Sequence, residues 1–298
     1  MQSVPPQLLT PATLASLANL ELVARTAVEG FLVGLHRSPR FGFSQEFKEY
    51  RAYVEGDDPR FVDWNVFART ERTYIRRYEG ETNTRLMITM DASASMGYGS
   101  HSVTKLGYAK FLAAALAYLA SRQHDPAGLI VFDSTVREFR PPSARAGSLS
   151  GMIHAIDAVQ AGGSTNLTES FRAFHEHVSR RGLVAVISDL YCDPAALARA
   201  VQPLAYHGSD IMIFQILDPR ELKPDWNESV ILEDLESGEA LNVAPDYFRD
   251  KYGARLQAHL DSLRRAAAGV GAQQMLMSTA EPLDKALHRY LSFRQGRP

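Results

Sequence analysis

The chain has 298 residues, of which 45% are hydrophobic and 22% are charged, a composition typical of a globular protein. The formal net charge of -2 gives no electrostatic reason to expect nucleic acid or a membrane surface as a partner. The single cysteine, Cys192, excludes an intrachain disulfide and fits a reducing compartment. The start has no basic region followed by an apolar one, and the longest apolar run, Phe111–Ala120, is too short to span a bilayer. We therefore expect a cytoplasmic protein without a membrane span.

The N-terminal quarter differs in pattern from the rest of the chain. Apolar residues recur near helical spacing from Pro11 to His36, and Thr10 suits the N-cap of that helix. The segment Phe41–Arg69 is polar and aromatic, with little clear periodicity. We interpret Tyr74–Tyr78 as an edge strand that leads into a sheet. We expect an N-terminal helical and irregular extension of residues 1–80, packed on the main domain because it has too few apolar stretches to fold alone.

From Arg85 onward, segments with strand and helix patterns alternate along the chain. The expected strands are Leu86–Met90, Leu129–Phe132 with a hairpin partner at Val136–Phe139, Leu183–Ser188, Ile211–Leu217, a hairpin of Ser229–Leu235 and Ala240–Val243, and Gln273–Met277. The expected helices are Thr104–Arg122, Leu149–Val159, Leu167–Ser179, Pro194–Leu204, Asp246–Ala268 and Pro282–Phe293. This alternation predicts an α/β fold for residues 81–298, with a doubly wound, mostly parallel sheet and helices on both faces.

Polar residues follow two of the buried strands and stand in one glycine-rich loop. Asp91, Ser93 and Ser95 come directly after the first strand, Asp189 ends the strand that begins at residue 183, and Thr165 follows two glycines. Ligands of open α/β sheets bind beyond the carboxyl ends of the strands. Carboxylate and hydroxyl oxygens are the ligands that Mg²⁺, Mn²⁺ and Ca²⁺ take. By itself, Asp-x-Ser-x-Ser is equally compatible with a polar turn, but three pieces in this order favour a metal site.

That order resembles the metal-ion-dependent adhesion site of von Willebrand factor type A domains. The resemblance implies metal ligation by Asp91, Ser93, Ser95, Thr165 and Asp189, and a von Willebrand factor type A-like main domain. It implies a divalent cation, with Mg²⁺ expected first and Mn²⁺ or Ca²⁺ as alternatives. In the resembling domains, a Glu or Asp of a partner protein completes the metal shell.

A second resemblance involves the segment Glu46–Thr70. It contains Glu-Phe, Arg-x-Tyr, Gly-Asp-Asp-x-Arg, Asp-Trp and Ala-Arg-Thr, which is similar to the hallmark of the bacterial family named domain of unknown function fifty-eight. The resemblance covers roughly residues 15–295 and implies a partnership with a MoxR-type AAA ATPase or its client. The segment itself allows two interpretations. It is either a salt-bridged wrapper packed on the sheet domain, or a functional element, which would be a partner-docking surface or a lid near the metal.

Together these observations lead us to expect a metal-dependent protein-binding module and not an enzyme. The resemblance points to an adaptor that works with a MoxR-type ATPase in the assembly or activation of a client. Hydrolysis by a metal-bound water needs a base or a second ion. No cluster of acids and histidines adjoins Asp91, a serine stands where an Asp-x-Asp phosphatase needs its second carboxylate, and P-loop and Gly-x-Ser-x-Gly motifs are missing. A metal-dependent hydrolase, or a structural domain whose metal only stiffens loops, remain the alternatives.

Overall fold

The computed structural model describes residues 10–17, 19–36, 46–54, 62–79, 85–165, 169–170 and 181–295. The helix expected at Leu167–Ser179 lies almost entirely outside these residues. The chain divides into two compact units, one of residues 1–31 together with 84–298 and the other of residues 32–83. Residues up to Phe31 therefore group with the sheet domain, whereas the expected boundary lies near residue 80.

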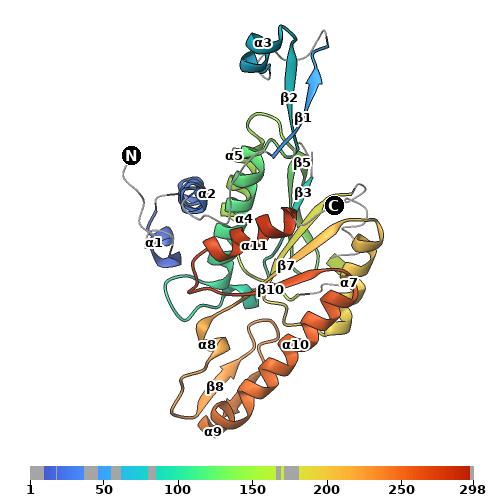
Figure 1. The fold of residues 1–298 in the computed structure, drawn as a ribbon. Coiled ribbons are helices and arrows are strands. Elements are labelled where there is room, and N and C mark those ends of the chain that lie inside the picture. The colour runs from blue at the N-terminus through green and yellow to red at the C-terminus, as the bar shows by residue number, and fades with distance from the viewer. Residues whose placement is uncertain are drawn as a thin grey trace. The chain divides into compact units, whose positions relative to one another are not determined.

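The larger unit is built on one six-stranded sheet (Figure 1). Its strands, in spatial order, are β10 (Gln273–Ser278), β7 (Asp210–Leu217), β6 (Leu183–Ser188), β3 (Leu86–Asp91), β4 (Ala127–Phe132) and β5 (Val136–Ser143). All neighbours are parallel except β4 and β5, which form an antiparallel edge. Every residue of β3, β4 and β6 is buried, as their uninterrupted apolar runs predict. The expected fold class is confirmed.

Helices cover both faces of this sheet (Figure 1). On one face, side chains such as Val184 and Ile213 join a buried cluster with Leu197 of α7 (Pro194–Tyr206) and Leu263 of α10 (Gly253–Gly269). The other face is covered by the alanine-rich helix α4 (Lys105–Arg122), which contacts four of the strands. The small alanine side chains let α4 lie close to the sheet. Helices α5 (Ser148–Ala158) and α11 (Asp284–Gln295) also belong to this unit.

The single helix expected from Pro11 to His36 is two helices in the structure. These are α1 (Pro11–Ala15) and α2 (Leu20–His36). The Thr10 hydroxyl accepts a bond from the Thr13 N–H, which confirms the N-cap. The break follows because the Ser16 hydroxyl donates to the Thr13 carbonyl and the Asn19 side chain accepts from the Leu22 N–H. Residues that cap helices here end one helix and begin the next.

The smaller unit contains a two-stranded sheet that the sequence pattern did not predict. Strand β1 (Glu46–Ala52) pairs antiparallel with β2 (Tyr74–Glu79), and the helix α3 (Trp64–Thr70) lies between them in sequence. The strand expected at Tyr74–Tyr78 is present as β2, but it pairs with β1 in this separate sheet and does not join the six-stranded one. Charged residues interrupt the apolar pattern of β1, so the segment did not look like a strand. Trp64 is 62% exposed.

A second two-stranded sheet lies between α8 (Pro219–Leu222) and the helical segment that leads into α10. It is the hairpin of β8 (Val230–Glu233) and β9 (Ala240–Val243), as expected from the sequence. The following helical segment begins with α9 (Pro245–Tyr247) and a π-helical stretch, Phe248–Tyr252. No helix within the described ranges combines the length and the apolar character needed to cross a bilayer.

Candidate metal centre

The site begins at Asp91, the last residue of β3, whose side chain is fully buried. Its Oδ1 accepts a hydrogen bond from the Ser93 N–H at 2.9 Å, and its Oδ2 accepts one from the Ser188 hydroxyl at 2.6 Å. The chain then turns through a short 3₁₀ helix, Ala94–Gly97. This turn brings the hydroxyl oxygens of Ser93 and Ser95 within 3.1 Å of each other. The Asp-x-Ser-x-Ser segment is thus folded into one cluster of oxygen atoms.

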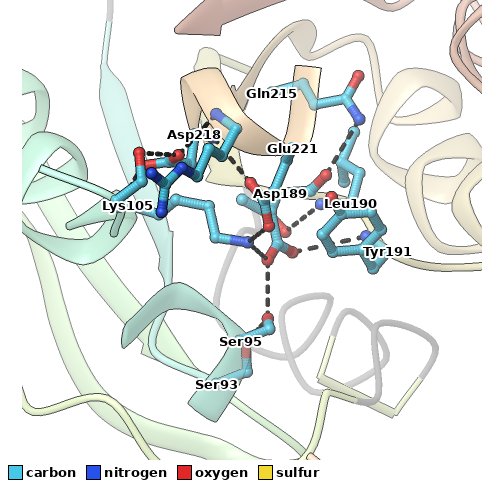
Figure 2. Close-up of polar contacts among 12 residues, drawn as sticks. Ser93, Ser95, Lys105, Asp189, Leu190, Tyr191, Gln215, Asp218 and Glu221 are labelled. Atoms are coloured by element: carbon cyan, nitrogen blue, oxygen red, sulfur yellow. Dashed lines mark hydrogen bonds and ion pairs between the residues drawn. The ribbon is translucent and has the colours of Figure 1, made fainter. Parts of the chain in front are cut away.

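Asp189 joins this cluster from the neighbouring strand β6. The Ser95 hydroxyl donates to its Oδ2 at 2.7 Å (Figure 2). The next residue, Leu190, has a positive φ of 56°, a conformation that is costly for a branched side chain. Such strain persists only where the surroundings enforce it, and here the Ser188 hydroxyl accepts the Leu190 N–H at 3.0 Å. Four of the five expected ligands, Asp91, Ser93, Ser95 and Asp189, therefore lie in one hydrogen-bonded network.

The glycine-rich loop runs directly beside this network. The Gly162 N–H donates to the Ala92 carbonyl, and the Ala94 N–H donates to the Gly163 carbonyl, each at 2.9 Å. Gly163 has a φ of 73°, and a Cβ there would lie 2.8 Å from a carboxylate oxygen of Asp133. Only glycine fits this position without a shift. The sequence signal of paired glycines thus reflects a close approach of two loops.

Asp133 and Arg137 hold this loop from the other side. The Asp133 carboxylate accepts bonds from the Thr135 N–H at 2.9 Å and from the Arg137 Nε at 2.6 Å. The guanidinium of Arg137 in turn donates to the carbonyls of Gln160 and Gly162. Asp133 therefore stiffens the loop as a turn residue.

Thr165 is the fifth expected ligand, and its contacts differ from those of the other four. Its N–H and its hydroxyl each donate at 2.8 Å to the Glu236 carboxylate, which lies in the turn between β8 and β9. The structure thus brings the Thr165 loop beside the site, but places its side chain against an acid that the sequence analysis did not single out.

Two further residues of the site were missed from the sequence, Lys105 and Glu221. The Lys105 ammonium donates to Asp189 Oδ2 at 2.8 Å and to Glu221 Oε1 at 2.7 Å (Figure 2). Lys105 is 1% exposed, and its Nζ lies 4.8 Å from the ring centroid of Tyr191. A lysine in the first turn of a helix is normally solvated, so nothing in its pattern indicated burial.

Glu221 did leave a signal in the sequence. Asp218 directly follows strand β7, which is the parallel neighbour of β6, so it had to lie at the same sheet edge as Asp189. Asp-Pro-x-Glu is also a capping-box pattern, and Asp218 and Glu221 cap α8 reciprocally. Asp218 additionally accepts two bonds from Ser100, which ties α8 to the loop before α4.

The network carries more negative than positive charge. Three connected carboxylates, of Asp91, Asp189 and Glu221, face the single ammonium of Lys105, so the network has two negative charges in excess when all three carboxylates are ionised. Burial, and then repulsion from Asp189, raise the pKa of Asp91 to about 7. Burial also raises the pKa of Glu221, despite the nearby Lys105. Burial would lower the pKa of Lys105, but Asp189 and Glu221 outweigh it and raise that pKa, so the ammonium stays charged.

This charge balance and the donor set fit one divalent cation. The oxygens of Asp91, Ser93, Ser95 and Asp189 are the hard ligands such an ion prefers. Within the part of the chain that the structure describes, no three His, Cys, Asp or Glu side chains gather as a metal-binding group. A metal centre here would therefore depend on the serine hydroxyls, which complete the two carboxylates. Thr165 would contribute only after giving up its bond to Glu236.

The comparison with known sequences finds one family and several uncharacterized relatives. The family described as "Protein of unknown function DUF58" matches residues 49–262. The uncharacterized proteins Mb1516 of Mycobacterium bovis and Rv1480 of Mycobacterium tuberculosis are each 28% identical over 292 residues. Each alignment covers 96% of this chain and 90% of the relative.

Solved structures show distant similarity to the sheet domain. BatB from Bacteroides thetaiotaomicron and an aerotolerance-related membrane protein from Bacteroides fragilis are each 14% identical, with TM-scores of 0.48 and 0.49. They cover 72% and 70% of this chain, and 100% and 98% of their own lengths. The SpRpn10 VWA domain, also 14% identical, has a TM-score of 0.41 and covers 72% of this chain and 98% of its own.

The buried ion pair leads to a prediction about stability. Lys105→Met keeps the aliphatic stem but leaves Asp189 and Glu221 buried without their ammonium. We expect it to lower the free energy of unfolding by about 3–5 kcal/mol, measured by urea denaturation in EDTA. The double variant Lys105→Met with Glu221→Gln should recover part of that loss, because one stranded carboxylate is gone. A single variant as stable as wild type would show that the ion pair does not hold this edge together.

Proposed function

The chain belongs to the DUF58 family of proteins of unknown function, and from that premise we propose that it is a metal-dependent protein-binding module. The observation that carries this proposal is the network of Asp91, Ser93, Ser95 and Asp189 at the carboxyl edge of the sheet. With Asp91 and Asp189 both ionised, their two negative charges equal the charge of one Mg²⁺, and Mn²⁺ or Ca²⁺ has the same charge and similar ligand preferences.

The residues of the network would make different contributions to binding the metal ion. Asp91 and Asp189 would supply charged oxygens, while Ser93 and Ser95 would supply neutral ones. Mg²⁺, when bound, supplies a Lewis-acidic position that accepts an outside carboxylate. Lys105 would hold Asp189 in place from the protein side through its 2.8 Å bond. Ser93, Ser95 and Asp189 stand on turns that are fixed by hydrogen bonds. The ligand side chains at this edge are therefore in place before any partner binds.

Binding fits the surroundings of the network better than catalysis does. Lys105 and His101 are two basic side chains that the structure describes at this edge. Lys105 is held protonated by Asp189 and Glu221, so it does not accept a proton. The Nδ1 of His101 accepts the Val103 N–H, so Nε2 carries the proton and donates to the Thr279 hydroxyl. Neither side chain is arranged as a general base for a bound water.

The partner that suits this edge is a protein with an exposed Asp or Glu. The family resemblance nominates a MoxR-type AAA ATPase or its client, with this chain as an adaptor in assembly or activation. We propose that the protein functions in the cytoplasm, because a single cysteine, which cannot form an intrachain disulfide, fits a reducing compartment.

A first test measures the metal itself. Titration calorimetry with MgCl₂ and MnCl₂ should show one binding site in wild type and none in Asp91→Ala, because that variant removes the central carboxylate. Asp157→Ala, which removes an exposed carboxylate on α5, is the matched control and should bind as wild type does. Equal affinity of wild type and Asp91→Ala would refute the metal site.

A second test measures the partner complex. The affinity of the partner complex should fall at least about tenfold when EDTA is added, or in the double variant Ser93→Ala with Ser95→Ala. Either change removes the contact between the metal and the partner's carboxylate, which contributes at least about 1.4 kcal/mol of binding free energy. Circular dichroism should show an intact fold in both cases. If the complex keeps its affinity through both treatments, the metal edge is not the interface, and the Glu46–Thr70 segment becomes the candidate surface.

A further inference from the structure

Thr165 presents two hydrogen-bond donors in the arrangement that a carboxylate accepts. Its main-chain N–H bonds one oxygen of Glu236 and its hydroxyl bonds the other, both at 2.8 Å. Two parallel donors on one carboxylate add geometric specificity as well as energy. The loop that carries Thr165 is held in place by Asp133, Arg137 and the backbone of residues 92–94. These contacts hold residues 160–163, so the stretch of loop that leads to Thr165 is positioned by bonds that do not involve Glu236.

The acid comes from a turn that is itself rigid. Asp234 accepts the Glu236 N–H at 2.8 Å and the Ser237 hydroxyl at 2.9 Å, and its carbonyl accepts the Gly238 N–H at 2.8 Å. These bonds shape the turn independently of Thr165. The local shape of the turn that presents Glu236 is thus set by the turn's own hydrogen bonds.

The hairpin behind this turn is loosely packed. It forms a two-stranded sheet separate from the main one, and Ile231 and Leu241 are 73% and 66% exposed. Only its base is buried, at Val243. Isolated two-stranded hairpins are marginally stable. The contact with Thr165 therefore fastens a weakly anchored hairpin tip to the rim of the candidate metal centre.

We infer that the Thr165 loop is a carboxylate-binding subsite, and that Glu236 is its internal occupant. An Asp or Glu side chain of a partner is the ligand that this subsite takes, and it must displace Glu236 to bind. The biological role of this subsite rests on the proposed function, because the subsite would bind the same acidic partner. The subsite itself needs only the two donors of Thr165, so it can be tested without any metal.

Tethering decides how strongly Glu236 competes. A group held on a short loop acts at an effective concentration in the millimolar range. A free carboxylate enters only the molecules in which the Thr165–Glu236 contact is open, so its apparent affinity in wild type is lowered by that fraction. Once Glu236 is removed, the same carboxylate should bind, and the hairpin tip should lose its attachment.

The experiment follows the Thr165 amide by NMR while sodium acetate is added in EDTA, with sodium chloride as the ionic-strength control. We expect a saturable shift in Glu236→Ala, and at least about tenfold weaker binding in wild type. Glu239→Ala is the matched control, because Glu239 lies in the same turn but bonds through its backbone only. It should behave as wild type does. Hydrogen exchange should also rise in residues 230–243 of Glu236→Ala, and not in the control.

Two results would overturn the inference. One is a Thr165 amide in Glu236→Ala that does not respond to acetate, and the other is hairpin exchange that is unchanged in that variant. Because EDTA is present throughout, neither result depends on a metal ion. Failure of the proposed function would be seen separately, as wild-type protein that binds no Mg²⁺ or Mn²⁺ in the calorimeter while the acetate result stands.

Discussion

The arrangement at the sheet edge depends on one buried contact, the ammonium of Lys105 between Asp189 and Glu221. It joins the start of α4, the end of β6 and helix α8, three elements whose sequence positions are far apart. Buried carboxylates are tolerated only when they are paired and hydrogen-bonded. Lys105 pairs with two of the three acids in the network, and Asp91 is left with hydrogen bonds alone. The excess of carboxylates over ammonium groups is the physical reason to expect a cation at this edge.

Around this inner network lies an outer layer that is built differently. The inner groups are buried and their geometry follows from strand ends that share one edge. The outer contact, between Thr165 and Glu236, joins a stiff loop to an exposed hairpin.

The fold was readable from the sequence wherever a strand is buried on both faces. The runs ending at Asp91 and Ser188 are continuous and apolar, and the acids after them had to meet at one edge because the strands are parallel. Lys105 was not readable, since its burial depends on Asp189 and Glu221 closing over it. Glu236 was not readable either, because its reach to Thr165 is set by tertiary placement of the hairpin. Strand β1 could not be predicted because charged residues interrupt its apolar pattern. A two-stranded sheet tolerates such charges, whereas a buried central strand does not.

The central claim is that charge balance in the buried network sets divalent-cation binding, and a calorimetric series tests it most directly. Mn²⁺ affinity should rise at least about tenfold in Lys105→Met and fall at least about tenfold in Glu221→Gln, because each variant changes the network by one charge a few ångströms from the ion. The double variant restores the wild-type charge and should restore an affinity near that of wild type. Equal affinities across all four proteins, or no binding by wild type, would contradict the account.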